Sequence, residues 1–150
     1  MLTALSRFRD VGVLALRLAF GFQLVKVSYE NVLYPAKKIP EFAAYLHSLG
    51  FPYPTPGAYV SAWTECLGGI LLILGLQTRW ASLLLFINFS VAVGMAHLNV
   101  SDTYQNTFPS LNLAAVSLFL LLNGAGRWSA DGLLMKPARQ TRSLGRSRTY

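Results

Sequence analysis

Residues 61–75, SAWTECLGGILLILG, form an apolar run of helical length that contains one carboxylate, Glu65. Extended to residues 57–75, the run approaches the roughly 20 apolar residues that a helix needs to cross the hydrocarbon of a bilayer. Lipid offers no hydrogen-bond partner to an open backbone, so a spanning segment of this kind must be helical. The stretch therefore predicts a transmembrane helix, and its glutamate needs an explanation.

Three further segments have a similar length and apolar character, at residues 11–29, 80–98 and 108–124. The chain has 150 residues, of which 53% are hydrophobic and only 13% charged, which is too apolar for an ordinary soluble domain. We therefore predict an all-α integral membrane protein. Its fold is expected to be an antiparallel four-helix transmembrane bundle that forms a single domain over residues 1–135.

The first outer loop and the C-terminal tail complete this architecture. An apolar stripe within IPEFAAYLHSLGF, residues 39–51, predicts a short helix at the outer membrane interface. Residues 136–150 form a basic tail without acidic residues, which we expect to be disordered and attracted to anionic lipid. The lipid bilayer is thus an expected partner, and nucleic acid is not.

The distribution of the net charge of +7 predicts the orientation. In a four-span arrangement only Lys37 and Lys38 lie in the outer loops. By the positive-inside rule both the N- and C-termini are cytoplasmic. The basic residues on the cytoplasmic side are Arg7, Arg9, Arg79, Arg127, Lys136, Arg139, Arg142, Arg146 and Arg148.

Two explanations for Glu65 remain open, because an ionised carboxylate at the bilayer centre costs about 3 kcal/mol on insertion scales. In the first, Arg17 forms a structural ion pair with Glu65, from which it lies roughly 5 Å toward the cytoplasm by helical rise. In the second, Glu65 closes the inner end of a polar pocket that opens to the outside. The other members of this pocket would be Gln23, Lys26, His97 and Asn112.

Within this pocket the residue types suggest different roles. Glu65 and His97 are the candidate catalytic groups, because carboxylate and imidazole can transfer protons. The candidate substrate-binding residues are Gln23, Lys26 and Asn112. No metal site is predicted, since one histidine and one glutamate on separate spans supply too few ligands. Asn88 is expected to form a hydrogen bond between helices.

Several segments resemble the DoxX family of small four-helix membrane proteins, over most of residues 11–135. Lys26 near the end of the first span and His97 belong to the same pattern, while Gln23 and Asn112 replace a glycine and an acidic residue that are common in the family. The segments that carry the resemblance are LRLAFG (16–21), FAAYLHSLGFPYP (42–54), ECLGGILLILGLQTRWAS (65–82) and GAGRWSADGLL (124–134).

The resemblance implies redox surroundings, because the related protein DoxD is a subunit of some thiosulfate:quinone oxidoreductases. It implies a multi-pass subunit of a bacterial-type plasma (inner) membrane that works with a soluble or membrane-bound oxidoreductase partner. No covalently bound cofactor is expected, and a quinone is the expected ligand. Whether the chain is itself an enzyme stays open. A non-catalytic anchor or assembly subunit and a small-molecule carrier are the alternatives.

Overall fold

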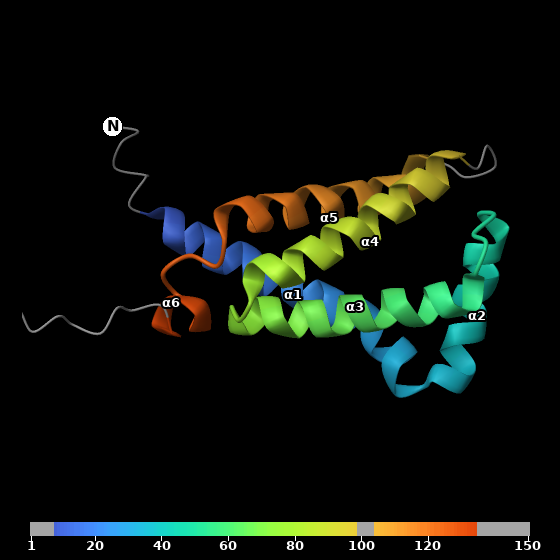
Figure 1. Ribbon diagram of the computed structural model, residues 1–150, viewed down its shortest axis with the longest axis horizontal. Helices are drawn as coiled ribbons and strands as arrows, with labels where there is room; N and C mark the ends of the chain where they lie inside the picture. Colours follow the sequence, from blue (N-terminus) through green and yellow to red (C-terminus); the bar gives the residue numbers. More distant parts are fainter. Residues whose placement is uncertain (1–7, 99–103, 135–150) are drawn as a thin grey trace, which may run out of the picture.

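The computed structural model describes residues 8–98 and 104–134, except for the side chains of Ala96, His97, Leu98 and Asn106. The described chain is helical apart from its turns and contains no strand (Figure 1), which confirms the all-α prediction. The helices are α1 (Arg9–Leu33), α2 (Pro35–Ser48), α3 (Pro54–Leu74), α4 (Thr78–Leu98), α5 (Tyr104–Asn123) and α6 (Ala130–Leu134).

Three of the described helices are long and apolar enough to cross a membrane, namely α1, α3 and α4. α5 occupies the position of the expected fourth span, but its apolar part, Thr107–Asn123, is shorter than the other three. At 1.5 Å per residue this part extends about 25 Å, slightly less than the roughly 30 Å hydrocarbon core. The bundle thus combines three long apolar helices with one shorter helix.

The four long helices pack as two pairs, α1 with α3 and α4 with α5 (Figure 1). Gly21 and Gly69 bring the backbones of α1 and α3 together. A Cβ on Gly69 would lie 2.8 Å from the Gly21 carbonyl oxygen, so no larger residue fits there. The two pairs cross near α6 and diverge toward α2, which gives the bundle an α6 end and a wider α2 end.

Helix α2 is longer than the sequence suggested and is packed against the bundle. It begins at Pro35, where a missing N–H costs nothing in the first helical turn, and it continues through Pro40. Ile39 and Ala43 are buried against Ala58 and Ala62 of α3. α2 therefore covers the outer part of α1 and α3 instead of lying apart from them.

The segment after α5 closes the α6 end. Asp131 accepts hydrogen bonds from the backbone N–H groups of Gln77 (2.8 Å) and Thr78 (3.0 Å), which lie at the start of α4. The backbone N–H of Asp131 also donates to the carbonyl of Gly75, at 2.9 Å. The GAGRWSADGLL segment thereby fixes the turn between α3 and α4.

Candidate functional site

A cavity of about 760 Å³ lies in the diverging half of the bundle and is lined by residues from α1 to α5. Its walls are mainly apolar and include Phe42, Phe89 and Met95. Polar side chains gather at two levels. Ser61, Glu65 and Asn88 lie at the inner level, which we call the floor, and the outer level consists of Glu30, Lys38 and Glu41.

The floor is organised around one oxygen of Glu65. Ser61 Oγ, one helical turn earlier on α3, donates a hydrogen bond to Glu65 Oε1 at 3.1 Å. Asn88 Nδ2 donates to the same oxygen from α4, also at 3.1 Å. Two donors therefore hold Oε1, and the described part of the protein gives Oε2 no hydrogen bond. The carboxylate is fixed by one oxygen, which leaves the other able to meet a ligand.

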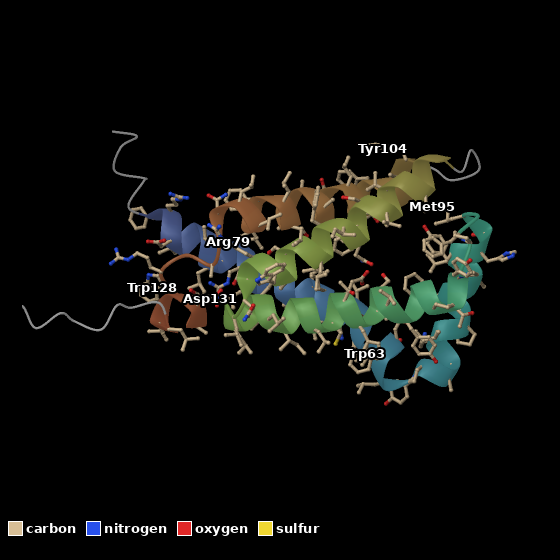
Figure 2. All side chains as sticks on the ribbon, in the orientation of Figure 1. Trp63, Arg79, Met95, Tyr104, Trp128 and Asp131 are labelled. Atoms are coloured by element: carbon tan, nitrogen blue, oxygen red, sulfur yellow. The ribbon has the colours of Figure 1, made fainter. Side chains whose placement is uncertain are left out.

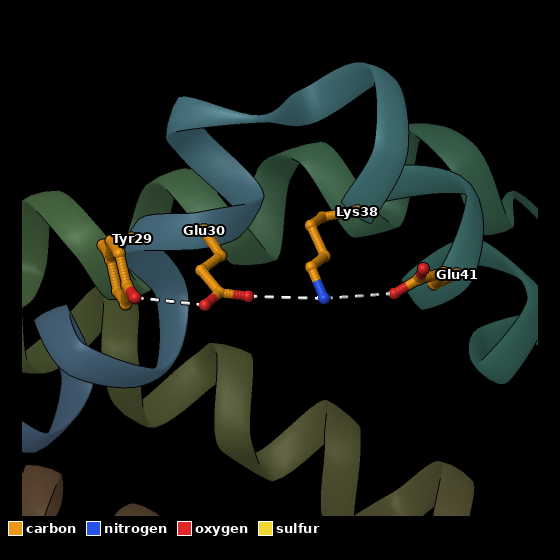
Figure 3. A network of polar contacts seen from close by, with 4 residues as sticks. All are labelled: Tyr29, Glu30, Lys38 and Glu41. Atoms are coloured by element: carbon orange, nitrogen blue, oxygen red, sulfur yellow. Dashed lines mark hydrogen bonds and ion pairs between the residues drawn. The ribbon is translucent and has the colours of Figure 1, made fainter.

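At the outer level, four side chains form a chain of contacts that we call the strap (Figure 3). Tyr29 Oη donates to Glu30 Oε1 at 3.0 Å, and Glu30 Oε2 lies 3.3 Å from Lys38 Nζ. Lys38 Nζ lies 3.4 Å from Glu41 Oε2. The strap joins the last turns of α1 to α2. The hydrogen bond to Glu30 and the charge of Glu41 raise the pKa of Lys38, so this lysine stays charged at physiological pH.

Of the residues selected from the sequence, Glu65 lies at the inner end of the cavity, whereas three others do not line it. Gln23, Lys26 and Asn112 are exposed on the outer surface of α1 and α5. Lys26 Nζ lies 5.2 Å from the ring centroid of Tyr29, and neither residue lines the cavity. The side chain of His97 lies outside the described residues, so its expected place in the pocket stays a prediction.

The expected ion pair between Arg17 and Glu65 is not formed, which corrects the sequence-based hypothesis. Arg17 is 1% exposed, and within the described residues its guanidinium donates to backbone carbonyls. Nε donates to Leu72 at 2.9 Å, whereas Nη1 donates to Trp128 at 3.1 Å and, over a shorter distance, to Ala125. Glu65 meanwhile bonds to Ser61 and Asn88.

The reason for this choice of partners lies at the end of α3. The last carbonyls of a helix have no partner within it and carry the negative end of the helix dipole, so they attract a cation. Gly75 ends α3 with φ +67°, and a Cβ there would collide with the Arg17 guanidinium. The arginine thus satisfies the end of α3 and reaches the segment after α5 at the same time.

The main floor residue that the sequence did not assign to the site is Asn88. Glu65 is residue 12 of the 21-residue α3, and Asn88 is residue 11 of the 21-residue α4. Because a short turn joins these helices, they run antiparallel and their midpoints meet at one depth. This alignment of the two helices could have been used to predict from the sequence that Glu65 and Asn88 are in contact. Asn88 does form a hydrogen bond between helices as expected, and its partner is Glu65.

The charged outer residues were missed because the sequence placed them in a loop. α1 continues to Leu33 and α2 begins at Pro35, so Glu30 and Lys38 lie on helices that face each other. Among the described side chains, which do not include that of His97, no three His, Cys, Asp or Glu gather as metal ligands.

Comparison with known proteins gives two matches. The sequence model of the DoxX family matches residues 12–98, which span α1 to α4 and include Arg17, Glu65 and Asn88. The uncharacterized membrane protein Rv3486 of Mycobacterium tuberculosis (strain ATCC 25618 / H37Rv) is 28% identical over 146 residues, covering 84% of this chain and 83% of the relative. No solved structure matches this sequence.

Proposed function

We propose that this chain, which belongs to the DoxX family of membrane proteins, is an inner-membrane subunit of a redox system and binds the head of a quinone or quinol above Glu65. The observation that carries the proposal is the floor of the cavity. A carboxylate in the middle of an apolar helix lines the cavity, and both of its hydrogen bonds within the described residues go to one oxygen. Such a residue is costly in a membrane and is commonly functional.

The residues that line the cavity fit a quinone. Its ring and tail require apolar and aromatic surroundings, which Phe42 and Phe89 supply, and its oxygen atoms require hydrogen-bonding groups. When ionised, Glu65 accepts a hydrogen bond from a quinol hydroxyl, and when protonated it donates to a quinone carbonyl. A bound quinone would carry electrons, while Glu65 Oε2 would hold or release the accompanying proton.

Ser61 and Asn88 are positioning residues in this proposal. Both donate to Oε1, so they fix the orientation of the carboxylate. A partner oxidoreductase, soluble or membrane-bound, would exchange electrons with the quinone. The α6 end would face the cytoplasm.

The orientation follows from the positive-inside rule applied to the two ends of the bundle. Figure 2 places Arg79, Trp128 and Asp131 at the α6 end and Met95 and Tyr104 at the other end. The basic residues Arg9 and Arg127 lie at the α6 end as well, whereas Lys37 and Lys38 belong to α2. The cavity would therefore widen toward the outer face of the membrane.

The test is quinone binding by the purified chain in lipid nanodiscs, followed through quenching of tryptophan fluorescence. The nearest tryptophan in the sequence is Trp63, which Figure 2 shows on α3; it lies two residues before Glu65 and outside the lining of the cavity, so quenching must act across the helix. We expect Glu65→Gln to weaken quinol binding about tenfold, the effect of losing one charge-assisted hydrogen bond. It should also remove the pH dependence of that binding. Cys66→Ala is the matched control, because Cys66 is buried beside Glu65 and does not line the cavity.

Equal quinol affinity and equal pH dependence in wild type and Glu65→Gln would refute the role of the carboxylate. If no quinone binds to the wild-type protein while a partner oxidoreductase copurifies with it, the chain is an anchor or assembly subunit. Uptake of a small molecule by vesicles that contain only this chain would instead favour a carrier.

A further inference from the structure

One wall of the cavity is open. Six apolar side chains line the cavity and are nevertheless exposed on the surface of the chain, and four of them belong to α3 and α4. A side chain in a closed wall would have little exposure, so the cavity reaches the exterior at this place. The other two are Val27 of α1 (64% exposed) and Tyr45 of α2 (45%). We call the four residues on α3 and α4 the rim: Val60 (66% exposed), Leu84 (57%), Ile87 (51%) and Val91 (45%).

The rim lies where the two helix pairs diverge. Nearer the α6 end α3 and α4 are in contact, because a Cβ on Gly68 would lie 3.0 Å from the side chain of Leu85. Toward the α2 end the helices separate (Figure 1). Val60 precedes Glu65 on α3 and Val91 follows Asn88 on α4, so both lie on the α2 side of the floor. The opening therefore faces sideways, at the depth of the apolar spans.

The outer level of the cavity has a different character. There the strap connects α1 to α2 through Glu30 and Lys38 (Figure 3). Apolar residues of α2 and the turn after it, Leu46, Leu49 and Phe51, also line this level. The outer level is thus bordered by charged side chains that are themselves partly exposed (Lys38 32%, Glu30 45%, Glu41 60%), whereas the sideways opening is bordered by apolar groups.

We infer that the ligand reaches Glu65 from the bilayer through the opening between α3 and α4, and that its apolar tail remains in this opening when the head is bound. The inference rests on the proposed function and narrows its ligand to an uncharged, membrane-dissolved amphiphile. A tail in the rim stays in contact with apolar groups along its length. A water-soluble anion would have to approach the Glu65 carboxylate through hydrocarbon, which is strongly unfavourable.

The test compares two quinones with the same head in wild-type and variant nanodiscs, one with a long isoprenoid tail and one without a tail. The measured quantity is the ratio of their dissociation constants. If a substitution alters the floor, it affects the common head of both quinones equally, so that effect cancels in the ratio. We expect Val91→Trp to weaken binding of the tailed quinone about tenfold, as for overpacking at an apolar contact, and to leave the tail-less quinone unchanged. Val91→Phe should give a smaller change in the same direction.

Two variants serve as controls. Ser90→Trp adds the same bulk to the neighbouring position, which is exposed but does not line the cavity, and it should leave the ratio unchanged. Lys38→Met breaks the strap and should also leave the ratio unchanged.

Two results separate failure of the inference from failure of the proposed function. An unchanged ratio in Val91→Trp, or a changed ratio in Lys38→Met, would place the tail elsewhere and overturn the inference while quinone binding stands. Absence of binding of either quinone to the wild-type protein would overturn the proposed function, and the inference with it.

Discussion

Replacement of Arg17 by methionine should destabilise the α6 end of the bundle more than any substitution of a surface residue at that end. The guanidinium is buried and connects α1 to the end of α3 and to the segment after α5. Methionine has a similar length and suits the apolar surroundings, but it cannot donate a hydrogen bond. Three elements would therefore lose their common contact without a large change in packing volume.

The expected magnitude follows from the contacts. A hydrogen bond from a charged donor contributes about 1.5–3 kcal/mol, so the three shorter contacts of Arg17 together contribute roughly 4.5–9 kcal/mol. Burial of the guanidinium offsets several kcal/mol of that gain. We expect Arg17→Met to lower the free energy of unfolding by about 2–4 kcal/mol.

The assay is reversible unfolding of the purified protein in mixed detergent micelles, titrated with a denaturing detergent and followed by helical circular dichroism. Arg79→Met is the matched control, because Arg79 is exposed at the same end, and it should change the free energy by less than about 0.5 kcal/mol. Arg17→Lys should lie between wild type and Arg17→Met, since one ammonium cannot reproduce the forked contacts. A loss below about 0.5 kcal/mol in Arg17→Met would refute the reasoning.

Three further predictions use the same unfolding assay. In a double-mutant cycle, the effects of Arg17→Met and Glu65→Gln on the free energy of unfolding should be additive within about 0.5 kcal/mol, because the residues share no partner. A larger coupling free energy would instead support the ion pair between them. Gly69→Ala should destabilise the protein by about 1–3 kcal/mol, because its new methyl group would lie 2.8 Å from the Gly21 carbonyl, whereas Gly94→Ala, with nothing within 4 Å, should be neutral or stabilising. The close contact of α1 and α3 is disproved if both alanines behave alike. Asp131→Ala should cost about 0.5–2 kcal/mol through loss of the α4 cap, and an unchanged midpoint would contradict that capping role.

The helices could be predicted from the sequence because membrane spans follow from length and apolar composition, which are local properties. The boundaries were less accurate where two helices meet. The short interfacial helix was expected within residues 39–51, but Pro35 provides an earlier start, and α2 is 14 residues long as a result. A proline is compatible with several positions near a helix start, so the sequence alone does not choose among them.

The members of the site were harder to predict because depth in the membrane is readable from the sequence, whereas helix rotation is not. Gln23 and Lys26 lie at suitable positions along α1 but on its exposed side. The rotation of α1 is fixed by the contact between Gly21 and Gly69, which turns Leu24 and Ser28 inward. A pairwise contact between distant segments thus decides which polar groups reach the cavity.

The separation of Arg17 from Glu65 bears directly on the two explanations for the buried carboxylate. Had the two formed an ion pair, the charge of Glu65 would be neutralised by a structural partner, and its presence would need no further reason. Instead the arginine binds carbonyls at the α6 end, while the described donors to Glu65 are the neutral side chains of Ser61 and Asn88. A carboxylate with neutral partners can gain or lose a proton without breaking an ion pair. The geometry of Arg17 therefore favours a ligand-binding role for Glu65 over a purely structural one.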